Sequence, residues 1–287
     1  MNKIATPKNT KEMVSKYGFH FSKSLGQNFL VDYNIIEKII RGAGITKDTN
    51  VIEVGPGAGS LTQGLSEAAK KVVAVEIDKK LIPILEDTLQ GYENIKVINE
   101  DILKLDLHQL LKDEFDGGDI KVIGNLPYYI TTPIIMKFLE EKVPVESIII
   151  MIQKEVADRM NAKPGNKDYG ALSVAVQYYC TTEIITIVPP TVFIPQPKVD
   201  SSVIKLNVLK EPKVKVERED IFFKVVKDAF GKRRKTLLNA LSSGDLQFNK
   251  DMVREVLKES NVDEKRRGET LSLDEFASIA NGFVRRI

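Results

Sequence analysis

The sequence predicts an α/β protein with a Rossmann-like, mostly parallel sheet and a small all-helical domain at its C-terminal end. From residue 49 to residue 160, short apolar runs alternate with amphipathic stretches, as in a parallel sheet covered by helices on both faces. After residue 210 the apolar runs give way to charged, helix-like patterns. A chain of 287 residues is long enough for both parts. We therefore expect a Rossmann-like domain over residues 1–210, including a basic N-terminal arm, and a helical domain over residues 211–287.

The composition excludes several classes of protein. Hydrophobic residues make up 43% and charged residues 29% of the chain, which excludes wholesale disorder. The formal net charge is only +2, so binding to nucleic acid must depend on local basic patches. The single cysteine, Cys180, excludes an internal disulfide, and with only His20 and His108 beside it we expect no metal site. The longest apolar run, residues 148–152, is too short to span a membrane, and no signal-peptide core is present, so we expect a soluble, cytoplasmic protein.

The first half of the chain contains the elements of the expected sheet. Residues 1–25 carry five lysines against one glutamate, and part of this arm is expected to be helical. Asp32 is the expected N-cap of an amphipathic helix over residues 34–40, which Gly42 and Gly44 end. The expected strands are residues 49–54, 71–77, 95–99, 120–124 and 147–153. The helices expected beside them are residues 60–69, 79–90 and 154–160.

The second half of the chain is less regular. Residues 172–179 are ambiguous between helix and strand, and residues 189–197 are rich in proline. Ser272, with Glu275 three residues later, matches a capping box at the start of the last helix. The remaining strand-like segments are residues 183–188 and 199–209, and the helices expected after them are residues 221–230, 234–241, 250–259 and 272–283.

A glycine-rich turn lies between the first expected strand and its helix. Residues 53–59 have the sequence EVGPGAG, and glycine allows a tight turn whose backbone can approach a ligand closely. Glu76 ends the second strand, where it can accept both ribose hydroxyls, and Asp101 follows the third, where it can accept a hydrogen bond from an adenine amino group. Each feature alone is explained as well by a simple turn or a helix cap. Because the carboxyl ends of parallel strands meet at one edge, the three together favour a nucleoside site, with NAD still an alternative.

The fourth expected strand ends in the sequence NLPY, residues 125–128. The Asn125 side-chain oxygen and the Leu126 carbonyl can accept the two hydrogens of adenine N6, whose lone pair is delocalised into the ring. Pro127 fixes the backbone, and Tyr128 can stack on the base and hold it at attack distance. Alone this run could be an ordinary turn, but with the glycine turn and the two acids it favours methyl transfer to adenine.

With these residues in place, the chain resembles the ribosomal RNA adenine N6,N6-dimethyltransferases of the small-subunit (KsgA/RsmA) type over nearly its full length. The sequences KSLGQNFL at residues 23–30 and FIPQPKVDS at residues 193–201 match further motifs of this family. The resemblance implies the fold of Rossmann-like S-adenosylmethionine-dependent methyltransferases, with Phe193 on the far face of a flipped adenine. It also implies that Gln27, Asn28 and Leu30 cover the methionine end of the cofactor. The cofactor-binding residues expected are Gln27, Asn28, Leu30, Gly55, Gly57, Glu76, Ile77, Asp101, Ile102 and Asn125, and the catalytic residues expected are Asn125, Leu126, Pro127, Tyr128 and Phe193.

The C-terminal part narrows the substrate. Residues 229–241 and 267–272 are similar to two motifs of the small-subunit type. The resemblance implies that the protein dimethylates two adjacent adenosines in the 3′-terminal hairpin loop of 16S ribosomal RNA. We expect a monomer whose partners are this RNA and the assembling 30S particle; the sequence leaves open whether naked RNA or the particle is the substrate. Residues 232–235 place four cations at an expected helix start, where they could bind phosphates, although such runs are often only solvated surface. The RNA-binding residues expected are Lys23, Lys232, Arg233, Arg234 and Lys235.

Three other functions fit parts of the sequence. A large-subunit adenine methyltransferase that confers antibiotic resistance would share the Rossmann-like half and differ in the ribosomal subunit that it methylates. A non-catalytic RNA-binding assembly factor could use the same scaffold without the cofactor site, yet the residues of that site are present here. A small-molecule or protein-amine methyltransferase would leave the basic C-terminal motif without a purpose.

Overall fold

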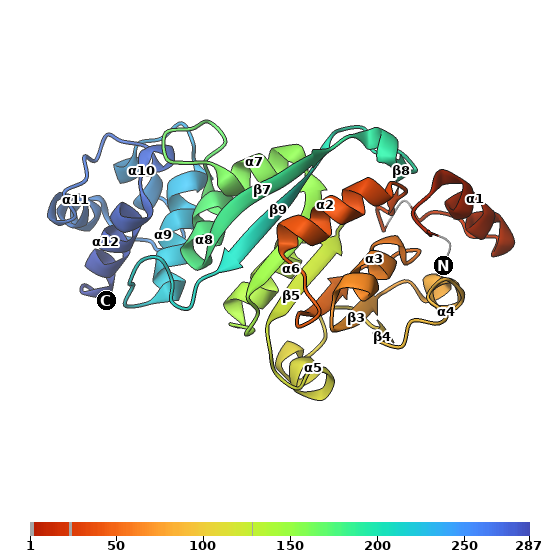
Figure 1. Ribbon diagram of the computed structural model, residues 1–287. Coiled ribbons are helices and arrows are strands. Elements are labelled where there is room, and N and C mark those ends of the chain that lie inside the picture. Colours follow the sequence, from red (N-terminus) through yellow and green to blue (C-terminus); the bar gives the residue numbers. More distant parts are fainter. Residues whose placement is uncertain (1–2, 23–24, 128) are drawn as a thin grey trace. The chain divides into compact units, whose positions relative to one another are not determined.

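A seven-stranded sheet forms the centre of the first part of the chain in the computed structural model, which describes residues 3–22, 25–127 and 129–287 (Figure 1). The strand order is β4-β3-β2-β5-β6-β9-β7. The neighbouring strands in the series β4-β3-β2-β5-β6 pair in parallel, and β9 pairs antiparallel with β6. The mostly parallel sheet predicted from the apolar runs is confirmed. Its strands are β2 (Asn50–Val54), β3 (Lys71–Glu76), β4 (Ile95–Asn99), β5 (Ile120–Asn125), β6 (Ser147–Gln153), β7 (Cys180–Val188) and β9 (Ser201–Val208).

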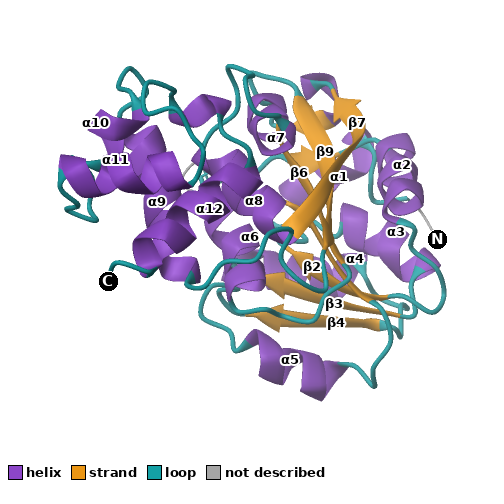
Figure 2. Ribbon diagram, turned by 90° about the vertical axis from the view of Figure 1, so that its left-hand side faces the viewer, coloured by secondary structure: helices purple, strands orange, loops and turns teal. Residues whose placement is uncertain are grey.

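Helices cover both faces of this sheet, which is why its central strands are apolar on both sides (Figure 2). Figure 2 shows α2 and α3 on one side and α6 on the other. Ile36 and Ile39 of α2 share one core cluster with Val51 of β2 and Ile149 of β6. The helices of this part are α1 (Pro7–Lys16), α2 (Tyr33–Ala43), α3 (Ser60–Ala68), η1 (Lys79–Leu81), α4 (Ile82–Thr88), α5 (Leu107–Glu114), α6 (Thr131–Glu140), α7 (Lys154–Asn161) and η2 (Pro190–Val192).

Local sequence signals define the ends of α2. The Asp32 side chain accepts a hydrogen bond from the Asn34 backbone N–H at 2.8 Å, which confirms the expected N-cap. Gly44 ends the helix in the left-handed conformation, with a φ of 66°. Gly42, which we expected to help end the helix, lies inside it. A Cβ there would approach the Ile185 side chain to 2.4 Å, so glycine is required for this contact with β7.

A second, two-stranded sheet joins the N-terminal arm to a distant segment. β1 (Phe29–Leu30) pairs antiparallel with β8 (Phe193–Ile194), so that Leu30 lies opposite Phe193. Met13 of α1 belongs to a core cluster that also contains Leu85 of α4. The arm is therefore anchored to the body of the sheet next to the loop that follows residue 192.

A second compact unit comprises Asp158–Thr182 and Leu209–Ile287, whereas the first comprises Met1–Ala157 and Glu183–Val208. Residues 158–182 thus fall in the second unit, although the sequence analysis placed them in the first domain. The helices of this unit are α8 (Ala171–Tyr179), α9 (Glu219–Gly231), α10 (Leu237–Leu241), α11 (Lys250–Glu259), η3 (Gly268–Thr270) and α12 (Leu273–Val284). None of the helices in the described residues is long and apolar enough to cross a membrane.

Two features of this second unit relate directly to the sequence. The ambiguous residues 172–179 are helical, and the ring centroid of Tyr178 lies 4.9 Å from that of Phe222 on α9. The capping box of α12 is confirmed, because the Ser272 hydroxyl accepts from the Glu275 backbone N–H and the Glu275 carboxylate accepts from the Ser272 backbone N–H.

Candidate functional site

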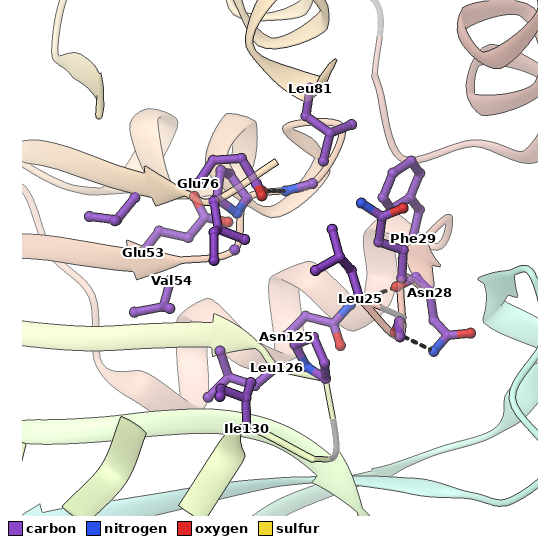
Figure 3. A pocket seen from close by; sticks show the side chains of 18 of the residues that line it. Leu25, Asn28, Phe29, Glu53, Val54, Glu76, Leu81, Asn125, Leu126 and Ile130 are labelled. Atoms are coloured by element: carbon purple, nitrogen blue, oxygen red, sulfur yellow. Dashed lines mark hydrogen bonds between the residues drawn. The ribbon is translucent and has the colours of Figure 1, made fainter. Parts of the chain in front are cut away.

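A pocket opens at the carboxyl ends of the parallel strands, the edge at which α/β sheets bind ligands (Figure 3). Its walls come from the loop before β1, the glycine turn after β2, the ends of β3 and β4, and the turn after β5. The expected site residues that line it are Gln27, Asn28, Leu30, Gly55, Gly57, Glu76, Ile77, Asp101, Ile102, Asn125, Leu126, Pro127 and Phe193. The expected residues Tyr128 and Lys23 lie outside the described residues.

The glycine turn has a backbone that other residues adopt only with strain. Gly55 and Gly57 have φ values of 69° and 60°. A Cβ on Gly57 would lie 3.1 Å from the Phe29 ring, whereas one on Gly55 would have no heavy atom within 4 Å. The turn therefore packs tightly at Gly57 and leaves open space at Gly55, as a cradle for a ligand requires.

The Glu76 carboxylate is held at the end of β3 by two backbone donors. It accepts from the Gly57 N–H at 3.2 Å and from the Asp78 N–H at 2.8 Å. The residue is only 5% exposed, and this burial raises the pKa of Glu76 to about 7 although both N–H donors oppose the shift. Glu76 is thus a fixed hydrogen-bond acceptor whose charge changes near neutral pH.

The next wall of the pocket combines an acid with apolar side chains. One Asp101 oxygen accepts from the Leu103 backbone N–H at 3.0 Å, and the other lies 3.9 Å from the Lys104 Nζ atom. Ile77 is 53% exposed and Ile102 is buried. A large apolar side chain exposed in a pocket wall is suited to cover the face of a flat ligand ring.

The loop before β1 is fixed to the end of β3 through Gln27. The Gln27 amide donates to the Asp78 carboxylate at 2.8 Å, and its oxygen accepts from the Ser22 backbone N–H at 2.8 Å. Asn28 donates its side-chain N–H to the Gly26 carbonyl at 3.0 Å. Because both ends of the Gln27 amide are used within the chain, its side chain positions this loop over the pocket.

Asn125 points into the pocket from the end of β5 (Figure 3). Its Nδ2 atom donates to the Asn28 backbone carbonyl at 2.8 Å. This bond fixes the orientation of the amide, and the Oδ1 atom accepts no hydrogen bond from the described residues. The site therefore presents an oriented, unused acceptor at the end of the fourth parallel strand along the chain.

Phe193 is part of the apolar core as well as of the pocket wall. It is 2% exposed, belongs to the cluster that contains Ile36, and lies opposite Leu30 in the β1–β8 pair. Its ring therefore serves the apolar core as well as the lining of the pocket.

The pocket lining also includes residues that the sequence analysis did not assign to the site, among them Glu53 on β2 and Tyr129 after β5. Glu53 is 1% exposed, and neither of its carboxylate oxygens has a hydrogen-bond partner in the described part of the chain. Burial raises the pKa of Glu53 to about 8. The available signals were an acid in an otherwise apolar strand and a second tyrosine after NLPY. Within the described ranges, no group of three or more His, Cys, Asp or Glu side chains could hold a metal ion.

The four cations of residues 232–235 lie in the second unit, in the turn between two helices. α9 ends at Gly231, and Thr236 is the N-cap of α10. The expectation that residues 232–235 stand at the start of a helix beginning at residue 234 is therefore wrong. The helix begins only at Leu237, after a turn closed by a hydrogen bond from the Lys235 N–H to the Lys232 carbonyl.

These cations differ in their contacts. Arg233 donates to the Lys167 carbonyl at 2.8 Å and lies 3.8 Å from the Glu269 carboxylate. The Lys232 ammonium donates to Ser243. The exposed side chains of Arg234 and Lys235 have no hydrogen-bond or ion-pair partner among the described residues, so these two are available to an external anion.

Comparisons with known proteins agree with this geometry. The family model of ribosomal RNA adenine dimethylases matches residues 18–279. The chain is 64% identical, over all of both chains, to the ribosomal RNA small subunit methyltransferase A of Alkaliphilus oremlandii. It is 62% identical to the protein of that name from Clostridioides difficile, over 98% of this chain and 97% of the relative. Its fold is similar to a dimethyladenosine transferase from Plasmodium falciparum, with a TM-score of 0.74 and 27% identity over 90% of this chain and 98% of the other. It is also similar to the 23S rRNA methyltransferase ErmE, with a TM-score of 0.66 and 25% identity over 88% and 98% of the two chains.

Proposed function

Because this chain belongs to the ribosomal RNA adenine dimethylase family, we propose that it dimethylates the N6 amines of two adjacent adenosines in the 3′-terminal hairpin loop of 16S ribosomal RNA. It is an S-adenosylmethionine-dependent RNA methyltransferase. The observation that carries the choice of the small subunit is the 64% identity, over the whole chain, to a relative named for that subunit. We take the assembling 30S particle as its substrate and a monomer as its active form.

The pocket suits the nucleoside part of the cofactor. Glu76 would accept the ribose hydroxyls, Asp101 would accept from the adenine amino group, and Ile77 and Ile102 would cover the adenine faces. The open space at Gly55 allows a ligand to approach the backbone of the turn. When bound, S-adenosylmethionine supplies an electrophilic methyl group on a sulfonium.

The chain contributes hydrogen-bond acceptors and orientation to the reaction. The Oδ1 atom of Asn125 and the carbonyl of Leu126 would accept hydrogen bonds from the two N6–H groups. These bonds would leave the nitrogen lone pair free for attack. Phe193, together with Tyr128, would hold the plane of the flipped base. The proton that N6 loses passes to water at the pocket mouth, so the reaction requires no strong general base. After the first transfer one N6 hydrogen remains, and the same acceptors can orient the amine for the second.

The test is methyl transfer from labelled S-adenosylmethionine to ribosomal subunits that lack these methyl groups, with the modified positions mapped by primer extension. We expect label in the 3′-terminal hairpin of the small-subunit RNA. Label only in the large subunit would support a resistance methyltransferase. Cofactor binding is measured by calorimetry. No binding at tens of micromolar would support a non-catalytic assembly factor.

The affinity for S-adenosylmethionine is expected to rise with pH through neutrality. The pKa of Glu76 is raised to about 7 by burial, and the ionised form is the better acceptor for two ribose hydroxyls. With a pKa of about 7, the ionised fraction of Glu76 rises about ten-fold from pH 6 to pH 8, so we expect a gain of about ten-fold in affinity over this range. Calorimetric titrations of wild type and Glu76→Gln measure this, and the variant should bind weakly with a flatter pH profile. An equally steep profile in the variant would assign the dependence to another group.

Arg234 and Lys235 are expected to bind RNA phosphates, because their side chains have no partner in the described residues. Replacing both with alanine should lower RNA affinity and reduce the slope of log affinity against log salt by about 1 to 2, since each phosphate contact contributes about 0.9. Filter binding across a salt series measures the slope. The matched control is Arg233→Ala, which removes the contacts to Lys167 and Glu269. It should lower the melting temperature and change the salt slope less than the double variant does. Equal slopes for wild type and the double variant would exclude phosphate binding by this pair.

A further inference from the structure

Tyr129 is the residue of the pocket mouth to which the proposed function assigns no role. It follows the NLPY sequence directly, lines the pocket, and is 60% exposed. Every other Phe and Tyr side chain among the described residues is buried or half-buried. A tyrosine ring that remains exposed where a ligand enters is a feature that packing does not explain.

Two hydrogen bonds link the described residues on either side of Tyr129. The Pro127 carbonyl accepts from the Ile130 backbone N–H at 3.1 Å and from the Thr131 hydroxyl at 3.1 Å. A Cβ on Gly26 would lie 3.2 Å from the Pro127 Cβ atom and 3.8 Å from the Tyr129 Cε1 atom, so the ring has the loop before β1 at one side. Gly26 has no side chain, which leaves room for this close approach, and its φ of 58° also favours glycine. The ring is thus supported on one side and open on the other.

We propose that the exposed Tyr129 ring stacks on the nucleobase next to the adenosine that occupies the pocket. The inference rests on the proposed function: Tyr129 and Asn125, four residues earlier in the chain, line the same pocket, so an adenosine held at Asn125 would lie in the pocket that this ring lines. A neighbouring nucleotide is joined to the target by one phosphodiester, so its base remains at the mouth. Stacking on an aromatic ring replaces the contacts that both bases lose when the target leaves the RNA stack.

Two RNA hairpins test the proposal, each carrying the fluorescent base 2-aminopurine on one side of the target adenosine. They are titrated with the protein and S-adenosylhomocysteine, which prevents turnover. We expect wild type and Tyr129→Phe to quench the fluorescence of one hairpin. Tyr129→Ala should lose the quenching and bind RNA about ten-fold more weakly, in line with the energy of base–aromatic stacking. Ile187→Ala, which removes an exposed apolar side chain of β7 that does not line the pocket, should behave as wild type.

Four outcomes separate stacking from other roles and from the proposed function. Cofactor affinity should be equal in wild type and Tyr129→Ala, and a parallel loss of cofactor and RNA affinity would overturn the proposal by assigning Tyr129 to loop support. Quenching by Tyr129→Ala as strong as in wild type would also overturn it. If the bare hairpins do not bind wild type, the KM for unmethylated small subunits is measured instead. The proposal then expects the KM to rise about ten-fold in Tyr129→Ala and to stay unchanged in Tyr129→Phe. Wild type that binds and quenches without transferring methyl groups would refute the proposed function and leave the stacking intact.

Discussion

Replacing Asn125 with alanine is expected to lower the rate of methyl transfer by about a hundred-fold or more, the typical loss when one preorganised hydrogen-bond partner of the reacting group is removed. The Asn125 Oδ1 atom is oriented by the bond from Nδ2 to the Asn28 carbonyl, and among the described residues no donor occupies it, so it can accept from the adenine amine. Without it, the amine hydrogens lose one of their two acceptors, and the lone pair stays conjugated with the ring. RNA and cofactor should still bind, because other residues provide most of their contacts.

Single-turnover assays with preformed RNA–protein–cofactor complexes measure this effect on the chemical step. Asn94→Ala is the matched control, since the Asn94 amide donates to the Ser66 carbonyl at 2.9 Å outside the pocket lining. It removes an asparagine of equal size and should leave the single-turnover rate unchanged. A rate near that of wild type in Asn125→Ala would refute the acceptor role.

Replacing Glu53 with glutamine is expected to make the protein more stable at alkaline pH and to flatten the dependence of its stability on pH. The Glu53 carboxyl is buried and has no hydrogen-bond partner among the described residues, because the nearby Thr62 hydroxyl is not in hydrogen-bonding geometry. Burial raises the pKa of Glu53 from 4.5 to about 8, and the charge of Glu76 contributes to the shift in the same direction. Between these values the folded state holds a proton that the unfolded state releases, so the free energy of unfolding falls as the pH rises.

The size of this effect follows from the linkage of protonation to folding. From pH 5 to pH 8 the wild type should lose about 3 kcal/mol more of its free energy of unfolding than Glu53→Gln does. Urea unfolding at pH 5, 6.5 and 8 measures the difference between the two profiles. Glu37→Gln replaces an exposed glutamate of α2 and should follow the wild-type profile. Parallel profiles for wild type and Glu53→Gln would mean that Glu53 is ionised and paired in the folded protein.

Features that depend on neighbouring residues in the chain were predictable from the sequence. The parallel strands follow from apolar runs separated by helical patterns, and the Asp32 N-cap and the Ser272 capping box follow from side chains within three residues of the backbone groups that they satisfy. The gathering of Gly55, Glu76, Asp101 and Asn125 at one pocket was predictable as well, because consecutive parallel strands place their carboxyl ends at the same edge.

The tertiary structure decided whatever depends on segments distant in the chain. Residues 172–179 are apolar in a way that suits a helix or a strand, and they form a helix whose Tyr178 packs on Phe222. Arg233 differs from Arg234 only because Lys167 and Glu269 come within its reach. The burial of Phe193 depends on the pairing of β1 with β8, and the orphaned carboxyl of Glu53 depends on what packs around β2. A sequence pattern records the preferences of single residues and short spacings, whereas these properties arise from which surfaces meet when the chain is packed.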